Sequence, residues 1–304
     1  MKKSITVLCL SYLLISCMDN TVVLPRSVGA FNKVIVVAKG SLWAGDVGDQ
    51  IRNSFGELMV GLPQPEKTLS VGHVAPNGFT SMMRSNRNVL VIELSDKTSY
   101  VKTTNKYANP QTLIYLSAKD KMGLLSSLKE HMSEIIQTFK ESDIKVLQRS
   151  FYNKRVNDSM YKTLKKLNIS LTIPEEFKTV DDTGDFLWLR QHLKSGIARG
   201  AGNNNILVYS LPLNDQTMSS NNIISMRDQI GEKYIPGSKQ GMYMITEAAY
   251  TPRTIKTEFL GNDAFETRGK WEVKNDFMAG PFLNYSIIDK KNDRLLVVEG
   301  FTYA

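Results

Sequence analysis

The placement of cysteine is the sequence feature that most constrains how this chain folds. Only two cysteines occur among 304 residues, Cys9 and Cys17, and both lie near the start. The rest of the chain therefore has no thiol for a disulfide, a zinc–thiolate site or a catalytic nucleophile. Hydrophobic residues form 42% of the chain, which is enough to bury a core. The body must fold by packing that core, without disulfide cross-links.

The N-terminal segment predicts export and lipidation. Two lysines follow the first residue, and an apolar stretch of 11 residues, Ile5–Ile15, comes next. That stretch is too short to span a bilayer as a helix. Leu14-Ile15-Ser16-Cys17 resembles a bacterial lipobox, in which the signal is cleaved before a cysteine that becomes lipidated. The sequence therefore predicts a signal peptide over residues 1–16, which carries Cys9 away, and a lipid anchor on Cys17.

Residues 17–30 form the lipidated cysteine and a polar tether. No acidic block follows Cys17 of the kind that marks some lipoproteins for the cell surface. We therefore expect an outer-membrane anchor with the body in the periplasm. The anchor at Cys17 is the expected contact with the membrane, because two or three acyl chains hold stably whereas one holds only marginally.

The charge of the chain indicates which partners it suits. The formal net charge is +8, which becomes +6 when Lys2 and Lys3 leave with the signal, from 36 basic minus 30 acidic residues. The excess is spread over the chain without a dense basic run, so no nucleic-acid partner is predicted. It suits an anionic surface, such as lipid headgroups or cell-wall polymers, and ordinary solvated surface charge is the alternative.

Spacing patterns predict an α+β fold in which helices cover β-sheet. Helices are predicted near residues 44–59, 124–139 (continuing, broken or bent, to about 167) and 219–233. The strands at 88–95 and 98–104 are expected to pair as a hairpin, as are 282–288 and 295–298. The remaining predicted strands lie near residues 33–38, 68–75, 112–116, 178–180, 186–189, 206–209, 242–245, 255–260 and 270–273.

Glycine and asparagine at residues 200–205 predict a loop between an N-terminal α+β region, 31–199, and a C-terminal one, 200–304. Both regions contain strand, helix, proline and strand in that order, around Asp49-Gln50-Ile51 and Asp228-Gln229-Ile230. This leaves open an architecture of two similar α/β halves. The chain stops directly after a strand, so this strand is a sheet edge or the natural protein continues.

Several short motifs resemble one known family. The opening motifs are Trp43–Asp49, Leu62–Glu66 and Arg87–Val89, and the closing motifs are Thr267–Glu272, Met278–Phe282 and Glu299–Tyr303. In order and spacing they resemble the Bacteroidetes lipoproteins grouped as domain of unknown function 4837, over most of the chain after the tether. Lys270 and Ala279 depart from the leucine and glycine usual there. The resemblance implies an envelope location and no particular activity.

Metal and cofactor chemistry has little support in the sequence. The three histidines, His73, His131 and His192, lack the spacing of metal ligands. Asp181, Asp182 and Asp185 fit a turn better than a calcium loop. We predict no metal, no cofactor and no assigned catalytic residue.

Two residue groups remain as candidate binding platforms. Asp46 and Asp49, near Trp43, would suit a sugar-binding platform, although carboxylates are also favoured in a first helical turn and Trp43 would fit a core. The second group is Arg268, Trp271 and Phe282. Tryptophan and arginine are common interface anchors, and core packing is the alternative.

The leading hypothesis is a non-enzymatic, lipid-anchored envelope lipoprotein that binds or helps assemble another envelope component. The alternative is a periplasmic glycan- or peptidoglycan-binding protein or hydrolase that uses Trp43, Asp46, Asp49 or His73. Clustering of those side chains in a cleft would favour the alternative. An exposed apolar patch around Trp271 and Phe282 would favour the leading hypothesis.

Overall fold

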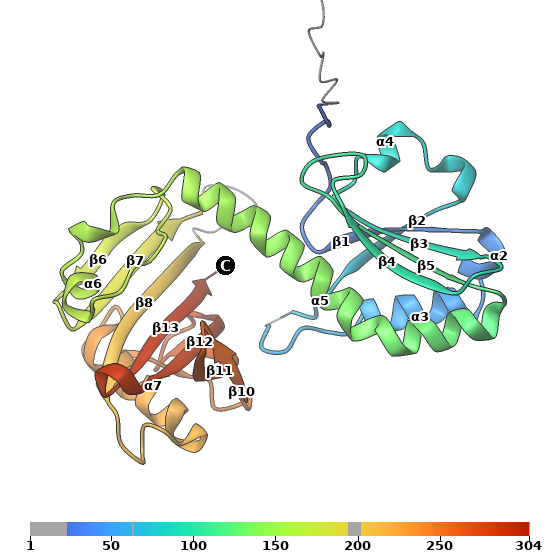
Figure 1. Ribbon diagram of the computed structural model, residues 1–304. Coiled ribbons are helices and arrows are strands. Elements are labelled where there is room, and N and C mark those ends of the chain that lie inside the picture. Colours follow the sequence, from blue (N-terminus) through green and yellow to red (C-terminus); the bar gives the residue numbers. More distant parts are fainter. Residues whose placement is uncertain (1–22, 63, 194–201, 304) are drawn as a thin grey trace, which may run out of the picture. The chain divides into compact units, whose positions relative to one another are not determined.

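A computed structural model describes residues 23–62, 64–193 and 202–303, and confirms the α+β class (Figure 1). Contacts divide these residues into two units, one of residues 23–47 and 72–131 and the other of residues 48–71 and 132–303. Each unit contains β-sheet and helix. The predicted signal peptide and Cys17 lie outside the described residues.

A five-stranded mixed sheet forms the centre of the first unit, in the order β2-β1-β3-β5-β4. Strands β1, β3 and β5 pair in parallel, and β4 is antiparallel to β5. The parallel strands carry apolar residues on both faces, as expected where both faces are covered. The strands are β1 (Lys33–Ala38), β2 (Ser70–Val74), β3 (Asn88–Leu94), β4 (Ser99–Thr104) and β5 (Thr112–Ala118).

Helices α3 (Asp46–Phe55) and α5 (Lys121–Asn153) confirm the first two predicted helices. Each buries a stripe with the spacing of a helix face. In α3 this stripe includes Val47, Ile51 and Phe55, all at most 2% exposed. The chain leaves helical structure after Asn153 and resumes it in the short α6 (Lys162–Leu167), so the expected continuation to residue 167 is broken. Two further short helices are α2 (Gly40–Trp43) and α4 (Ser81–Arg84).

The second unit contains an eight-stranded sheet with the order β10-β11-β12-β13-β8-β7-β6, in which β9 pairs with β11. Every pair of neighbouring strands is antiparallel. The predicted hairpin over residues 282–298 is confirmed as β12 and β13. The strands are β6 (Lys178–Asp182), β7 (Phe186–His192), β8 (Asn203–Pro212), β9 (Met244–Thr246), β10 (Arg253–Phe259), β11 (Asn262–Val273), β12 (Ala279–Asp289) and β13 (Arg294–Tyr303).

Both faces of this large sheet are partly covered by other segments of the same unit. Helix α7 (Ile223–Tyr234) packs Ile224, Met226 and Ile230 against one face. The segment 156–177, which includes α6, packs against the other face. Because strand residues alternate between faces, the strands β7, β8, β11, β12 and β13 each contribute to two separate cores.

Asp182 joins the end of β6 to the start of α6. Its carboxylate accepts hydrogen bonds from the backbone N–H groups of Lys162, at 2.7 Å, and Thr163, at 2.9 Å, and from the Thr163 hydroxyl at 2.7 Å. Burial alone would raise the pKa of Asp182, but the hydrogen bonds from Thr163 and Lys162 outweigh it and lower the pKa below its usual value. The aspartates near residue 182 thus serve the predicted turn between β6 and β7 and cap a helix.

Two expectations about connectivity are wrong, and one alternative left open for the last strand does not hold. The strands at 88–95 and 98–104 do not form a hairpin, because β5 inserts between β3 and β4. The asparagines of the expected loop at 200–205, Asn203–Asn205, instead begin β8. The strand that ends the chain, β13, lies between β12 and β8 rather than at an edge.

The two stretches with the same element order are not a structural repeat. In the first stretch, β1 and β2 are neighbours in a mixed sheet. In the second, β8 and β9 lie in one antiparallel sheet but are separated by β13, β12 and β11. The expected division at residue 200 also falls between β7 and β8, which pair with each other in the second unit.

Candidate pocket at one end of the large sheet

A pocket of about 420 Å³ lies within the second unit, where the last turn of α5 meets the ends of β7, β8 and β13. Volumes of this order are typical of small-ligand sites. Its lining combines aromatic rings, amides and hydroxyls with few charges. The lining residues are Ser150, Phe151, Lys154, Thr172, Pro174, Glu176, Phe177, Gln191, Asn204, Asn205, Ile206, Gly300, Phe301 and Thr302.

Backbone hydrogen bonds hold the helical wall of the pocket against the segment that follows it. The Val156 N–H donates to the Ile173 carbonyl, and the Glu175 N–H donates to the Lys154 carbonyl, both at 2.9 Å. These bonds fix the end of α5 beside residues 172–177. As a result Phe151 and Phe177 line the same pocket from two different segments.

The sheet side of the pocket carries a row of amide and hydroxyl groups. Asn204 is in register with Gln191 on β7 and with Thr302 on β13. Its Nδ2 donates to Gln191 Oε1 at 3.1 Å, and its Oδ1 accepts from Thr302 Oγ1 at 3.0 Å. A side-chain amide has more donor and acceptor positions than these bonds use. The row can therefore exchange further hydrogen bonds with a polar ligand.

Asn205 holds β8 in place on the opposite face of the sheet. Its Oδ1 accepts hydrogen bonds from Trp188 Nε1 at 2.9 Å and Arg190 Nε at 3.1 Å. The Arg190 guanidinium also lies 4.7 Å from the Trp188 ring, within the range of a cation–π contact. The Asn204 side chain thus bonds to neighbours in the pocket lining, whereas the Asn205 side chain bonds to Trp188 and Arg190 on the opposite face of the sheet.

The chemistry of the lining favours binding over hydrolysis. Only one carboxylate, Glu176, and one amine, Lys154, belong to it. A glycosidase generally needs two carboxylates that flank the scissile bond. The charges of Glu176 and Lys154 are opposite, so the lining has no net charge and suits an uncharged polar ligand.

The first sequence-predicted group does not form this pocket. The Trp43 ring stacks on the His73 ring with centroids 4.8 Å apart, and His73 Nε2 lies 2.9 Å from the Ala38 carbonyl oxygen. Asp46 and Asp49 are exposed on α3, and Asp49 pairs with Arg52 at 2.6 Å. The expected sugar-binding platform is therefore not the site that the pocket defines.

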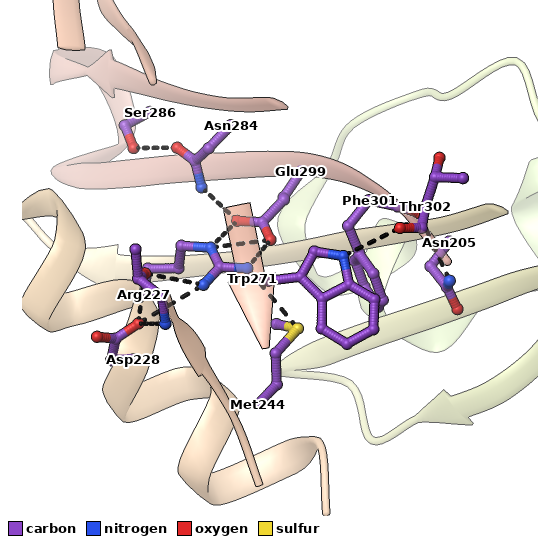
Figure 2. A network of polar contacts seen from close by, with 11 residues as sticks. Asn205, Arg227, Asp228, Met244, Trp271, Asn284, Ser286, Glu299, Phe301 and Thr302 are labelled. Atoms are coloured by element: carbon purple, nitrogen blue, oxygen red, sulfur yellow. Dashed lines mark hydrogen bonds and ion pairs between the residues drawn. The ribbon is translucent and has the colours of Figure 1, made fainter. Parts of the chain in front are cut away.

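The second predicted group is divided between the two faces of the large sheet. Trp271 and Phe282 are each 3% exposed and belong to the core beneath α7. Trp271 Nε1 donates to the Thr302 carbonyl at 3.1 Å (Figure 2). Arg268 lies an odd number of residues from Trp271 on β11 and therefore faces the other way. These residues do not form the exposed apolar patch that a shared interface would need.

Arg268 instead belongs to a cluster with Glu266 and Tyr285. Arg268 Nε donates to Glu266 at 2.7 Å, and the Tyr285 hydroxyl donates to the same carboxylate at 2.6 Å. Burial raises the pKa of Tyr285 to about 12, and its bond to Glu266 adds to this. Burial would also raise the pKa of Glu266, but the bonds from Arg268 and Tyr285 outweigh it and lower that pKa.

A buried ion pair that the sequence analysis did not find joins α7 to the large sheet (Figure 2). Arg227 Nη2 lies 2.9 Å from Glu299 Oε1, and Arg227 Nε contacts both oxygens of that carboxylate. The two side chains are 2% and 0% exposed. Asn284 Nδ2 donates to Glu299 at 2.9 Å, and Thr246 Oγ1 accepts from Arg227 Nη1 at 3.0 Å. The pair positions α7; it does not line the pocket.

Among the described residues, no group of three or more His, Cys, Asp or Glu side chains is placed to hold a metal ion. His131 stacks on Tyr100 with ring centroids 4.1 Å apart. His192 ends β7. No helix in the described ranges is long and apolar enough to cross a membrane.

Comparison with known families divides the chain near the end of α5. Residues 156–304 match the family described as domain of unknown function DUF4837, which confirms the expected family for this part. Residues 27–152 match a different family, domain of unknown function DUF8532. The motifs at 43–49, 62–66 and 87–89 fall in that second match, so the first family does not account for them. No curated protein matches the chain.

Proposed function

Because the two matching families are described only as domains of unknown function, we propose a function from the residues themselves. The protein is a lipid-anchored lipoprotein of the cell envelope whose body lies in the periplasm. It is a binding protein, and its ligand is an uncharged glycan segment of the envelope. The observation that carries this proposal is the lining of the pocket between α5 and the large sheet.

The pocket offers the groups that a sugar chain needs. The rings of Phe151 and Phe177 present apolar surface to the faces of sugar rings, while Gln191, Asn204 and Thr302 present donors and acceptors to hydroxyl and acetamido groups. A second hollow, of about 550 Å³, shares Phe151 and Thr172 with the first and adds Tyr152 and Arg149. Two adjoining hollows suit consecutive units of one chain.

The shape of the site separates this proposal from the leading hypothesis of a protein partner. Protein interfaces are broad and bury roughly 800 Å² on each side. Small-ligand sites are concave, with volumes of about 300–1,000 Å³. The pocket of about 420 Å³ belongs to the second class, so we favour the glycan-binding alternative without hydrolysis. A stoichiometric protein partner is the competing outcome of the tests below.

We expect the substitution Gly300→Val to block the pocket without disturbing the fold. Gly300 is exposed in the lining, and a Cβ placed there would have Asn205 O as its nearest neighbour at 3.9 Å. Valine also favours strands. Titration of the full mature chain with a chito-oligosaccharide should show saturable binding that weakens at least tenfold in the variant, a loss of about 1.4 kcal/mol.

The matched control for this titration is Gly40→Ala, because a Cβ at Gly40 would meet nothing within 4 Å and the residue lies in the other unit. This control should bind as the parent does. If the parent binds no oligosaccharide, or if Gly300→Val binds equally well, the pocket is not a glycan site. A dominant stoichiometric protein, crosslinked in intact cells, would then identify a protein partner instead.

The lipid anchor has a separate test. Replacement of Cys17 by serine removes the thiol that would carry the diacylglycerol group. We expect the wild-type protein to sediment with membranes and to incorporate an alkyne-labelled fatty acid. The Cys17→Ser variant should incorporate none, because the thiol that would accept the lipid is missing. A wild-type protein without label would disprove lipidation.

A further inference from the structure

We propose that one face of the first unit docks on anionic lipid headgroups of the membrane that holds the Cys17 anchor. We call it the basic face and define it by Arg26, Arg84, Lys106 and Tyr107. The inference rests on the proposed lipidation of Cys17 for its location, but not on the pocket or its ligand. Three independent observations carry it, namely where the tether joins the body, the sign of the local charge, and the exposure of the side chains.

The tether joins the body inside this face. Segment 25–28 runs between two other segments, each bonded to it through the backbone. Asn109 N–H donates to the Pro25 carbonyl at 2.9 Å, and Ser27 N–H donates to the Asn109 carbonyl at 3.2 Å. On the other side, Val28 N–H donates to the Ser85 carbonyl at 2.9 Å. Arg84 and Lys106, in these same two segments, therefore lie where the tether meets the body.

The distance from the lipid is short. Val23, the first described residue, is six positions after Cys17 in the sequence. A fully extended chain spans at most about 3.6 Å per residue, so the lipidated cysteine lies within about 22 Å of Val23. A tether of this length keeps the adjoining face close to the membrane, where electrostatic attraction to headgroups acts over a Debye length of about 10 Å.

The local charge has a single sign. Segments 23–31, 76–87 and 105–111 contain four basic residues, Arg26, Arg84, Arg87 and Lys106, and no aspartate or glutamate. Arg87 is 7% exposed and lies over the Phe31 ring, so it is not part of the basic face. The other three are exposed. Exposed basic residues of this kind attract an anionic leaflet.

Side-chain contacts hold the cations in place rather than leaving them to move freely. The Tyr107 ring lies 5.2 Å from the Arg84 guanidinium and 5.4 Å from the Lys106 ammonium. Lys106 Nζ also donates to the Tyr115 hydroxyl at 2.9 Å.

Gln111 connects the two segments that carry these cations. This side chain is 2% exposed. Its Nε2 donates to the carbonyl oxygens of Arg84 and Asn86, and its Oε1 accepts from the Tyr107 N–H at 2.9 Å. The charged residues are thus fixed relative to each other before any membrane is met, which lowers the entropy cost of docking.

The test uses the mature chain with Cys17→Ser, so that binding does not depend on acylation. Flotation with vesicles of phosphatidylcholine alone and with added phosphatidylglycerol measures partitioning. We expect binding only to the anionic vesicles, and less of it at high salt. The double variant Arg84→Gln/Lys106→Gln should reduce partitioning about 25-fold, since each basic residue near an anionic surface contributes about fivefold.

Two controls make the result specific. Lys239→Gln/Lys291→Gln removes the same charge from exposed positions of the second unit and should retain binding. Arg84→Lys/Lys106→Arg keeps the charge in the basic face and should also bind, which excludes misfolding as the cause of a loss. Equal binding to both vesicle types, or an equal loss in the second-unit variant, would overturn the docking surface. Lipidation is judged separately by the fatty-acid label.

Discussion

Arg227→Met is expected to lower the free energy of unfolding of the second unit by about 3–5 kcal/mol, the usual cost of breaking a buried ion pair from one side. The substitution leaves Glu299, which is 0% exposed, without the guanidinium that contacts both its oxygens. Asn284 then supplies the one remaining hydrogen bond to this carboxylate shown in Figure 2. A single neutral donor cannot replace an opposite charge in a buried site.

The double variant Arg227→Met/Glu299→Leu should recover most of that loss. It removes the unpaired carboxylate together with the cation, and apolar replacements of buried ion pairs are often neutral or stabilising. Arg268→Met is the matched control. The distance between Arg268 and Glu266 is 2.7 Å, similar to the 2.9 Å between Arg227 and Glu299, but the Arg268 and Glu266 side chains are 29% and 17% exposed. We expect a cost of about 1 kcal/mol there, as for exposed pairs.

Denaturant unfolding in a Trp43→Phe background measures these differences. The tryptophans that remain, Trp188 and Trp271, both belong to the core of the second unit. Their fluorescence therefore reports on that unit. If Arg227→Met costs no more than Arg268→Met, or if the double variant is as unstable as the single one, the pair is not what holds α7 to the sheet.

Local signals predicted the elements of this fold better than their pairing. The amphipathic stripe of α5 and the turn between β12 and β13 depend on residues close in sequence, and both expectations are confirmed. The order β3-β5-β4 depends on a contact between β3 and a strand that comes after β4. Nothing in the apolar runs at 88–104 distinguishes that arrangement from a hairpin, because either one buries the same residues.

The candidate sites were also harder to predict than the helices and strands, because they depend on residues distant in sequence. Strand periodicity would have placed Arg268 and Trp271 on opposite faces, since they are three residues apart. The sequence could not predict the pocket, because it is formed by five segments that lie apart in the sequence. These are α5, residues 172–177, β7, β8 and β13. Its central residue, Asn204, lies in a Gly- and Asn-rich run whose composition is typical of a loop. The apolar strand that follows it, Ile206–Tyr209, was the signal that this run begins a strand.

Gly280→Ala is the second substitution for which we expect a large effect. Gly280 on β12 lies in register with Trp271 on β11, and it is buried. A Cβ at this position would lie 1.9 Å from the Thr302 carbonyl oxygen and 3.1 Å from Trp271 Nε1. The hydrogen bond from Trp271 to Thr302 occupies that space. We expect a loss of about 3 kcal/mol, at the upper end of the usual range for overpacking.

Gly300→Ala is the control for this substitution, because Gly300 lies on the neighbouring strand β13 but has room for a Cβ. Alanine there should change the free energy of unfolding by no more than about 0.5 kcal/mol. Gly280→Ala should also weaken ligand binding at the pocket, since a displaced Thr302 would break its bond to Asn204. If both variants lose the same stability, the loss does not come from the lack of space beside Gly280, and the close approach of Thr302 to Trp271 does not constrain position 280.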